Sequence, residues 1–211
     1  MTNETIDDVI VKIAPGLLKH KGVVIFSAAM YLHKLFDNAE DIDLFFLNQR
    51  EGILFRNYII DELGAKELQE LKQSCNGIYD SIFGRYELDG VEIEIMVNFK
   101  QRYKQTDHYF PIVSTLNVRK IKFQNGIDIP VATQYSLYKI YSTSPRLFDE
   151  SLVHKRDGEK KEMLIPNAFN DLTVLRGESL KTIIIHEEIK INLIILQPFS
   201  RLSLQRNLLR L

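Results

Sequence analysis

The sequence predicts an α/β (α+β) domain in which a mixed, mainly antiparallel sheet is flanked by helices, followed by a smaller C-terminal part. Three observations support this fold class. Apolar residues near the N-terminus recur at helical spacing, β-branched runs alternate with helix-forming segments, and two hairpin dipeptides separate strand-like runs. The 211 residues suffice for one domain with a sizeable core. We expect a main domain over residues 1–142 and an extension over 143–211, partly helical and packed on the core.

Helices and strands are expected to alternate in the first part of the domain. The first helix carries apolar residues at intervals of three and four, interrupted at Pro15-Gly16. Ser27 follows the first strand and is placed to cap the helix behind it, because a serine oxygen accepts a backbone N–H at a helix start. The expected elements are a helix over 6–18, a strand over 23–26, a helix over 28–36, a strand over 41–47 and a helix over 51–63.

Two hairpins are expected further along the chain. Asp89-Gly90 and Asn125-Gly126 both tolerate the positive φ of tight hairpin turns, so the strands on either side of each should be antiparallel neighbours. Beyond Ser144-Pro145 the signals become weaker, and the final segment is amphipathic. The expected elements are strands over 78–88, 91–99, 118–123 and 127–131, a helix over 134–141 and a helix over 200–211.

Composition excludes several functional classes. Twenty-seven basic and 28 acidic residues leave a formal charge of -1, so no global field attracts nucleic acid or a membrane. Cys75 is the only cysteine, which rules out an internal disulfide and a cysteine-based zinc site. A single thiol also suits a reducing compartment, and the acidic N-terminus does not resemble a secretory signal. We expect a cytoplasmic protein without a membrane segment.

Acidic residues on two expected strands are the candidates for chemistry. Strand side chains alternate in direction, so Asp41 and Asp43 project from one face, as do Glu92 and Glu94. If the two strands are neighbours, a third carboxylate joins the first two, and their repulsion would require a cation such as Mg²⁺, which prefers oxygen ligands. The alternative is that these acids are solvated, at the end of a loop and on a half-exposed strand.

The order of these features resembles the nucleotidyltransferase superfamily of the DNA polymerase β type, in particular its small prokaryotic members. The resemblance rests on a strand ending at Ser27, a helix, the Asp41-Ile42-Asp43 strand and a later strand acid, best assigned as Glu94. It covers roughly residues 20–100 and extends more weakly through Ile129-Pro130-Val131 and the helix bearing Lys139. Phe26-Ser27 stands where the family has Gly-Gly or Gly-Ser.

The resemblance implies roles for these residues. Asp41, Asp43 and Glu94 would bind Mg²⁺ or Mn²⁺ and carry the catalysis, with Glu94 also able to take the proton of the acceptor hydroxyl. Ser27 and Lys139 would contact the nucleoside triphosphate. A lysine on an exposed helix face is the alternative reading of Lys139.

Two functions remain open from the sequence. The first is metal-dependent transfer of a nucleoside monophosphate from a nucleoside triphosphate to a hydroxyl of a protein, a tRNA or a small molecule. The second is a non-catalytic interaction module of the same fold, such as an antitoxin-like protein of a toxin–antitoxin pair. The three acids favour the first function and Phe26 favours the second.

Overall fold

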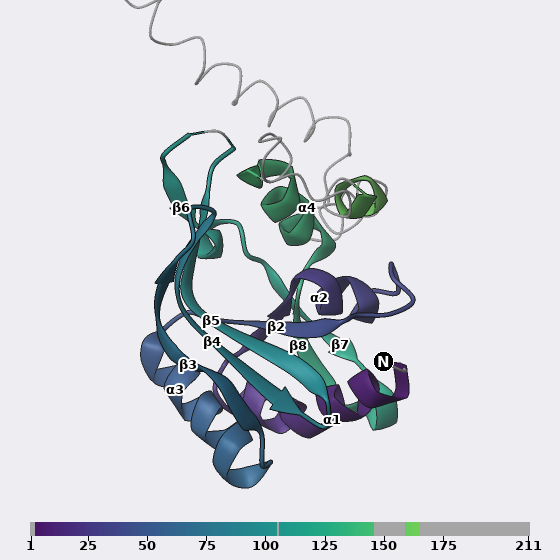
Figure 1. Ribbon diagram of the computed structural model, residues 1–211. Coiled ribbons are helices and arrows are strands. Elements are labelled where there is room, and N and C mark those ends of the chain that lie inside the picture. The colour runs from purple at the N-terminus through teal and green to yellow at the C-terminus, as the bar shows by residue number, and fades with distance from the viewer. Residues whose placement is uncertain (1–2, 105, 146–158, 165–211) are drawn as a thin grey trace, which may run out of the picture. The chain divides into compact units, whose positions relative to one another are not determined.

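The computed structural model describes residues 3–104, 106–145 and 159–164, which form helices around an eight-stranded sheet (Figure 1). The helices are α1 (Asn3–Lys19), α2 (Phe26–Leu32), α3 (Gln49–Asn57) and α4 (Gln134–Thr143); η1 (Tyr58–Glu62) is a π-helical turn, η2 (Ile112–Ser114) and η3 (Gln124–Gly126) are 3-10 turns, and residues 159–164 are helical. The strands are β1 (Val23–Ile25), β2 (Asp41–Phe46), β3 (Lys66–Cys75), β4 (Tyr79–Leu88), β5 (Val91–Arg102), β6 (Tyr109–Pro111), β7 (Val118–Lys122) and β8 (Asp128–Ala132).

The sheet is mixed and mainly antiparallel, as predicted. Its strand order is β3-β4-β5-β2-β1-β8-β7, and β6 pairs with β5 beside this path. The β2–β5 and β1–β8 pairs are parallel, whereas the other pairs are antiparallel. The central strands are apolar on both sides where they are covered, which is typical of strands inside an α/β sheet.

Helices α1 and α3 pack on the same side of the sheet (Figure 1). Helix α3 packs closely against β5 at Gly52. A Cβ atom at this position would overlap the side chain of Val97, so the absence of a side chain at Gly52 permits the close approach. Helix α1 continues through Pro15, so the predicted interruption there is wrong. Burial of the apolar face of α1, including Val9, Ile13 and Leu17, outweighs the hydrogen bond that proline cannot donate.

Both predicted hairpin turns are present. Asp89 and Gly90 have φ values of 52° and 78°, and Asn125 and Gly126 have values of 55° and 75°. The strands around each turn pair antiparallel. The sequence did not predict β3 or β6. Strand β3 lies at the sheet edge with most of its residues exposed on both sides, so it lacks the apolar alternation that reveals a half-buried strand.

The chain divides into two units, Met1–Ala168 and Phe169–Leu211, and the second lies outside the described residues. The predicted division between residues 142 and 143 therefore stays a prediction. The helix expected over 200–211 also lies outside the described residues. Among the helices that the structure describes, none is both long and apolar enough to cross a membrane.

Candidate active site

The parallel pairing of β2 with β5 brings the predicted acids together. In its register Asp43 lies opposite Glu94 and Asp41 lies opposite Glu92. Residues that are opposite in a sheet point to the same face, so all four carboxylates are on one side. The acids differ in surroundings, because Asp43 is buried with 7% of its surface exposed, whereas Glu92 is half-exposed and lies 3.5 Å from the guanidinium of Arg85.

Ser27 joins the acids through its side chain. Its hydroxyl donates a hydrogen bond of 2.9 Å to Oδ1 of Asp41. The predicted role of Ser27 as a helix cap is wrong, since α2 begins one residue earlier and has no side-chain cap at Ile25. The hydroxyl instead fixes the orientation of the Asp41 carboxylate at the edge of the site.

Burial and mutual repulsion make the acid cluster unfavourable when fully ionised. Loss of hydration raises the pKa of Asp43 well above its ordinary value, and the charges of Asp41 and Glu94 raise it further. Burial, with the charge of Asp41, raises the pKa of Glu94 to about 7.

The donor set of this cluster suits a hard divalent cation. Carboxylate oxygens are the ligands that Mg²⁺ and Mn²⁺ prefer, and a cation would relieve the repulsion that now raises the pKa values. In this conformation no group of three His, Cys, Asp or Glu side chains within residues 3–104, 106–145 and 159–164 is arranged to hold a metal ion.

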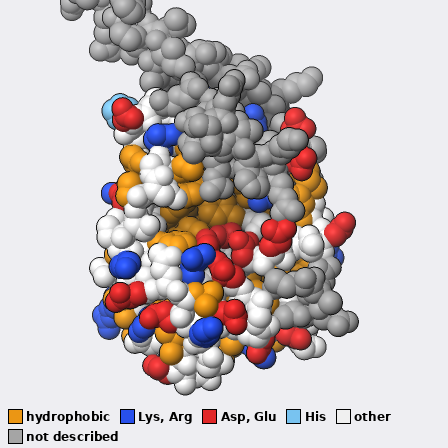
Figure 2. Space-filling model, viewed as in Figure 1, with side chains coloured by type: hydrophobic (Ala, Val, Ile, Leu, Met, Phe, Trp, Pro, Cys, Tyr) orange, Lys and Arg blue, Asp and Glu red, His pale blue; other side chains and the backbone are white. Residues whose placement is uncertain are grey.

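The acids lie at one end of a cleft of about 730 Å³. Figure 2 shows a hydrophobic recess with acidic side chains along one rim. This volume is within the usual range for small-molecule sites. The lining residues come from α2 and the loop behind it, from β2, the end of β3 and the turn after it, β4, β5, α4 and the residue after α4, and from the helical residues 159–160.

A bulge in β5 lets one strand supply both ends of the cleft. Glu94 and Met96 are two positions apart, so regular alternation of the strand points both into the cleft. Phe99 and Gln101 also line the cleft, although regular alternation from Met96 would point them to the opposite face of the sheet. A β-bulge at Asn98 reverses the alternation. The φ of Asn98 is 52°, and the register advances three residues along β5 for two along β4 at this point. One strand, β5, therefore contributes the acid Glu94 to the cleft and, after the bulge, the ring of Phe99 and the amide of Gln101.

Phe26 occupies the position where the resemblance expects glycine. Its backbone nevertheless has a φ of 51°, the left-handed conformation that glycine adopts without strain. The half-buried ring packs against three other rings that line the cleft, with centroid distances of 6.5 Å to Tyr79 and 5.9 Å to both Phe99 and Tyr141. The chain thus keeps the backbone of a glycine turn and adds an aromatic wall to the cleft.

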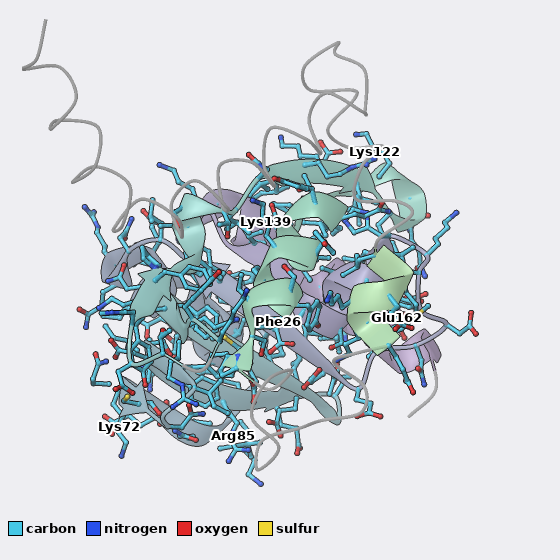
Figure 3. All side chains as sticks on the ribbon, turned by 90° about the horizontal axis from the view of Figure 1, so that it is seen from above. Phe26, Lys72, Arg85, Lys122, Lys139 and Glu162 are labelled. Atoms are coloured by element: carbon cyan, nitrogen blue, oxygen red, sulfur yellow. The ribbon has the colours of Figure 1, made fainter. Side chains whose placement is uncertain are left out.

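Of Lys139 and Lys160, only Lys160 lines the cleft. Lys139 of α4 is not among the residues that line the cleft, and its ammonium lies 5.3 Å from the ring centroid of Tyr135 (Figure 3). Lys160 does line the cleft, and its charge lowers the pKa of Asp43, opposing the effects of burial and of the neighbouring acids. The sequence does not single out Lys160, because acidic residues such as Glu159 and Glu162 alternate with the basic ones in this segment.

Comparisons with solved structures decide the fold. A candidate nucleotidyltransferase from Thermotoga maritima superimposes with a TM-score of 0.59 at 21% identity, covering 75% of this chain and 96% of that one. The antibiotic-resistance factor ANT(2'')-Ia superimposes with a TM-score of 0.54 at 13% identity, covering 90% and 97% of the two chains. The chain has the nucleotidyltransferase fold. No protein-family model matches the sequence, and no curated protein matches it.

Asp41, Asp43 and Glu94 lie on the adjoining strands β2 and β5, and a neighbouring strand for the third acid is what the resemblance implied. At these identities the likeness concerns the fold. Tyr79, Gln101 and Lys160 are among the lining residues that the sequence did not predict. No motif marks them, because a bulge and a chain segment distant in sequence bring them to the acids.

Proposed function

We propose that this protein transfers a nucleoside monophosphate from a nucleoside triphosphate to a hydroxyl group of an acceptor. The observation that carries the proposal is the convergence of Asp41, Asp43 and Glu94 at one end of a cleft large enough for a nucleotide. Clustered carboxylates with raised pKa values beside a cavity are typical of functional sites. The fold of the chain agrees with this chemistry.

The three acids would hold Mg²⁺ or Mn²⁺, which when bound would neutralise the phosphate charges and favour ionisation of the acceptor hydroxyl. Ser27 keeps Asp41 oriented through its 2.9 Å hydrogen bond. Lys160, the cation on the cleft wall, is placed to attract the triphosphate.

The acceptor oxygen forms a bond to the α-phosphorus while the bond from that phosphorus to the bridging oxygen breaks, and pyrophosphate leaves. The proton of the acceptor hydroxyl passes to a carboxylate oxygen of Glu94, the less buried member of the Asp43–Glu94 pair.

The test is labelling of an acceptor with matched carboxylate variants. The protein is incubated with each α-phosphate-labelled nucleoside triphosphate, Mg²⁺ or Mn²⁺, and a cell extract containing proteins, tRNA and small molecules. Glu94→Gln should abolish labelling, whereas Glu92→Gln should retain it, because Glu92 is on the same face but does not line the cleft. Labelling that survives Glu94→Gln would contradict the assignment.

One observation favours a second function, a non-catalytic partner-binding module such as an antitoxin-like protein. Phe26 replaces the expected glycine, and it lines the cleft together with Ser27. Calorimetric titration with each nucleoside triphosphate and Mg²⁺ separates the two functions. Absence of binding at millimolar ligand, together with absence of labelling, would support the module.

A further inference from the structure

The end of the cleft remote from Asp41 is built around Tyr79 of β4 and Gln101 of β5. The two residues are directly opposite in the antiparallel register, so their side chains share one face. Tyr79 is half-buried and lies against Phe26 and Phe99, with centroid distances of 6.5 Å and 4.9 Å. Two other rings therefore contact its ring, and part of the Tyr79 side chain remains open to the cleft.

Gln101 adds an unusual polar group to this end. The residue has no exposed surface, and its Nε2 donates a hydrogen bond of 2.9 Å to the carbonyl oxygen of Ile140. That bond fixes which end of the amide is oxygen. Oε1 is buried and accepts no hydrogen bond from the residues that the structure describes. An unsatisfied buried acceptor is unfavourable, so a ligand N–H that reached it would be bound selectively.

The position of this pair relative to the acids limits what can occupy it. Phe26 and Ser27 connect the two ends of the cleft, because the ring of Phe26 lies 6.5 Å from that of Tyr79 and the hydroxyl of the adjacent Ser27 donates to Asp41. A ligand with phosphates at the acidic end would thus extend its organic part over Tyr79.

We propose that Tyr79 and Gln101 form a nucleobase subsite that selects a base with an exocyclic amino group. The base stacks on Tyr79, and its amino group donates to Oε1 of Gln101. An aromatic platform contributes stacking to any base, whereas a single fixed acceptor discriminates in favour of a base that presents a donor. The inference rests on the proposed function, because it identifies the base of the nucleoside triphosphate.

The test uses nucleosides without phosphate or metal, so that it does not depend on the acids. Binding of adenosine and of purine riboside, which lacks the amino group, is measured by saturation-transfer NMR titration with the full chain. The wild type should bind adenosine about five- to ten-fold more tightly than purine riboside. This comparison needs no variant and is independent of any effect on folding.

Matched variants then assign the contacts. Tyr79→Leu should weaken binding of both nucleosides roughly five-fold or more, whereas Tyr79→Phe, which keeps the ring, should not. Gln101→Met should remove the preference for adenosine and leave purine riboside binding unchanged, with thermal melting as the check on folding. Asp43→Asn should leave adenosine binding unchanged.

Several results would overturn the subsite. They are equal binding of the two nucleosides by the wild type, adenosine binding that is insensitive to Tyr79→Leu, or adenosine that remains bound when an unreactive triphosphate analogue saturates the protein with Mg²⁺. Adenosine binding as expected without any transfer activity would instead contradict the proposed function alone. Transfer activity without dependence of base binding on Tyr79 would contradict the subsite alone.

Discussion

Asp43 and Glu94 carry an electrostatic cost that depends on pH. Because the folded protein raises the pKa of both carboxyl groups above their values in the unfolded chain, it binds protons more tightly than the unfolded chain does. The free energy of unfolding should therefore fall as the pH rises from about 4.3, the ordinary value for Glu, to about 7, where Glu94 titrates.

The measurement is thermal melting of metal-free protein from pH 4.5 to pH 8. Wild type should lose melting temperature across this interval, and Asp43→Asn, which cannot ionise at that position, should lose clearly less. If the melting temperature falls with pH equally in the two proteins, these acids are not the source of the pH dependence.

A divalent cation should relieve the electrostatic repulsion among these acids and so stabilise the folded protein. At ten times its dissociation constant a ligand stabilises the folded state by about 1.4 kcal/mol, which corresponds to a rise of roughly 3–6 °C for a chain of this size. Mg²⁺ or Mn²⁺ should therefore raise the melting temperature of the wild type at pH 8. Asp43→Asn should lose most of this rise, whereas Glu92→Gln should keep it, and equal shifts in all three proteins would argue against a cation at the acids.

The left-handed backbone at Phe26 can be tested by two truncations. Both Phe26→Gly and Phe26→Ala remove the ring and its three aromatic contacts, so both should destabilise the protein. Only glycine adopts a φ of 51° without strain, so the glycine variant should be more stable than the alanine variant by about 1 kcal/mol, the reverse of the order in an ordinary helix. Chemical denaturation measures the difference.

At the level of elements, the bulge in β5 decides which side chains reach the cleft. Asn98→Gly should leave the free energy of unfolding nearly unchanged, because glycine accepts a φ of 52°. Asn98→Val should destabilise by about 1–2 kcal/mol, because a β-branched residue disfavours that conformation. Denaturant titrations of the two variants give the comparison, and a valine variant as stable as the glycine variant would contradict the bulge geometry.

The same bulge marks the limit of prediction from the sequence. The acids of β2 and the start of β5 could be predicted, because a two-residue period and a familiar order of elements place Asp41, Asp43 and Glu94. Gln101 could not be predicted, since strict alternation from Glu94 would place it on the opposite face. Lys139 was chosen by resemblance, whereas Lys160 reaches the cleft from a segment without a regular pattern.

For the whole molecule, the position of each strand in the sheet should determine how strongly its backbone amides are protected from hydrogen exchange. Strand β2 lies at the centre of the strand order, while β3 and β7 are edges with mostly exposed residues. Amide exchange measured by mass spectrometry should be slowest in β2 and the adjoining part of β5, and fastest in β3 and β7. Equal protection of β3 and β2 would show that the edge is covered in solution.

The parallel pairing of β2 with β5 also has a consequence for folding kinetics. It joins Asp43 to Glu94, 51 positions later in the chain (94 minus 43), so a long loop must close before the strands can hydrogen-bond. Two carboxylates of like charge approach one another during that closure. The groups proposed to serve the cleft therefore oppose its assembly, and refolding should be faster in mild acid or with a divalent cation than in neutral, metal-free buffer.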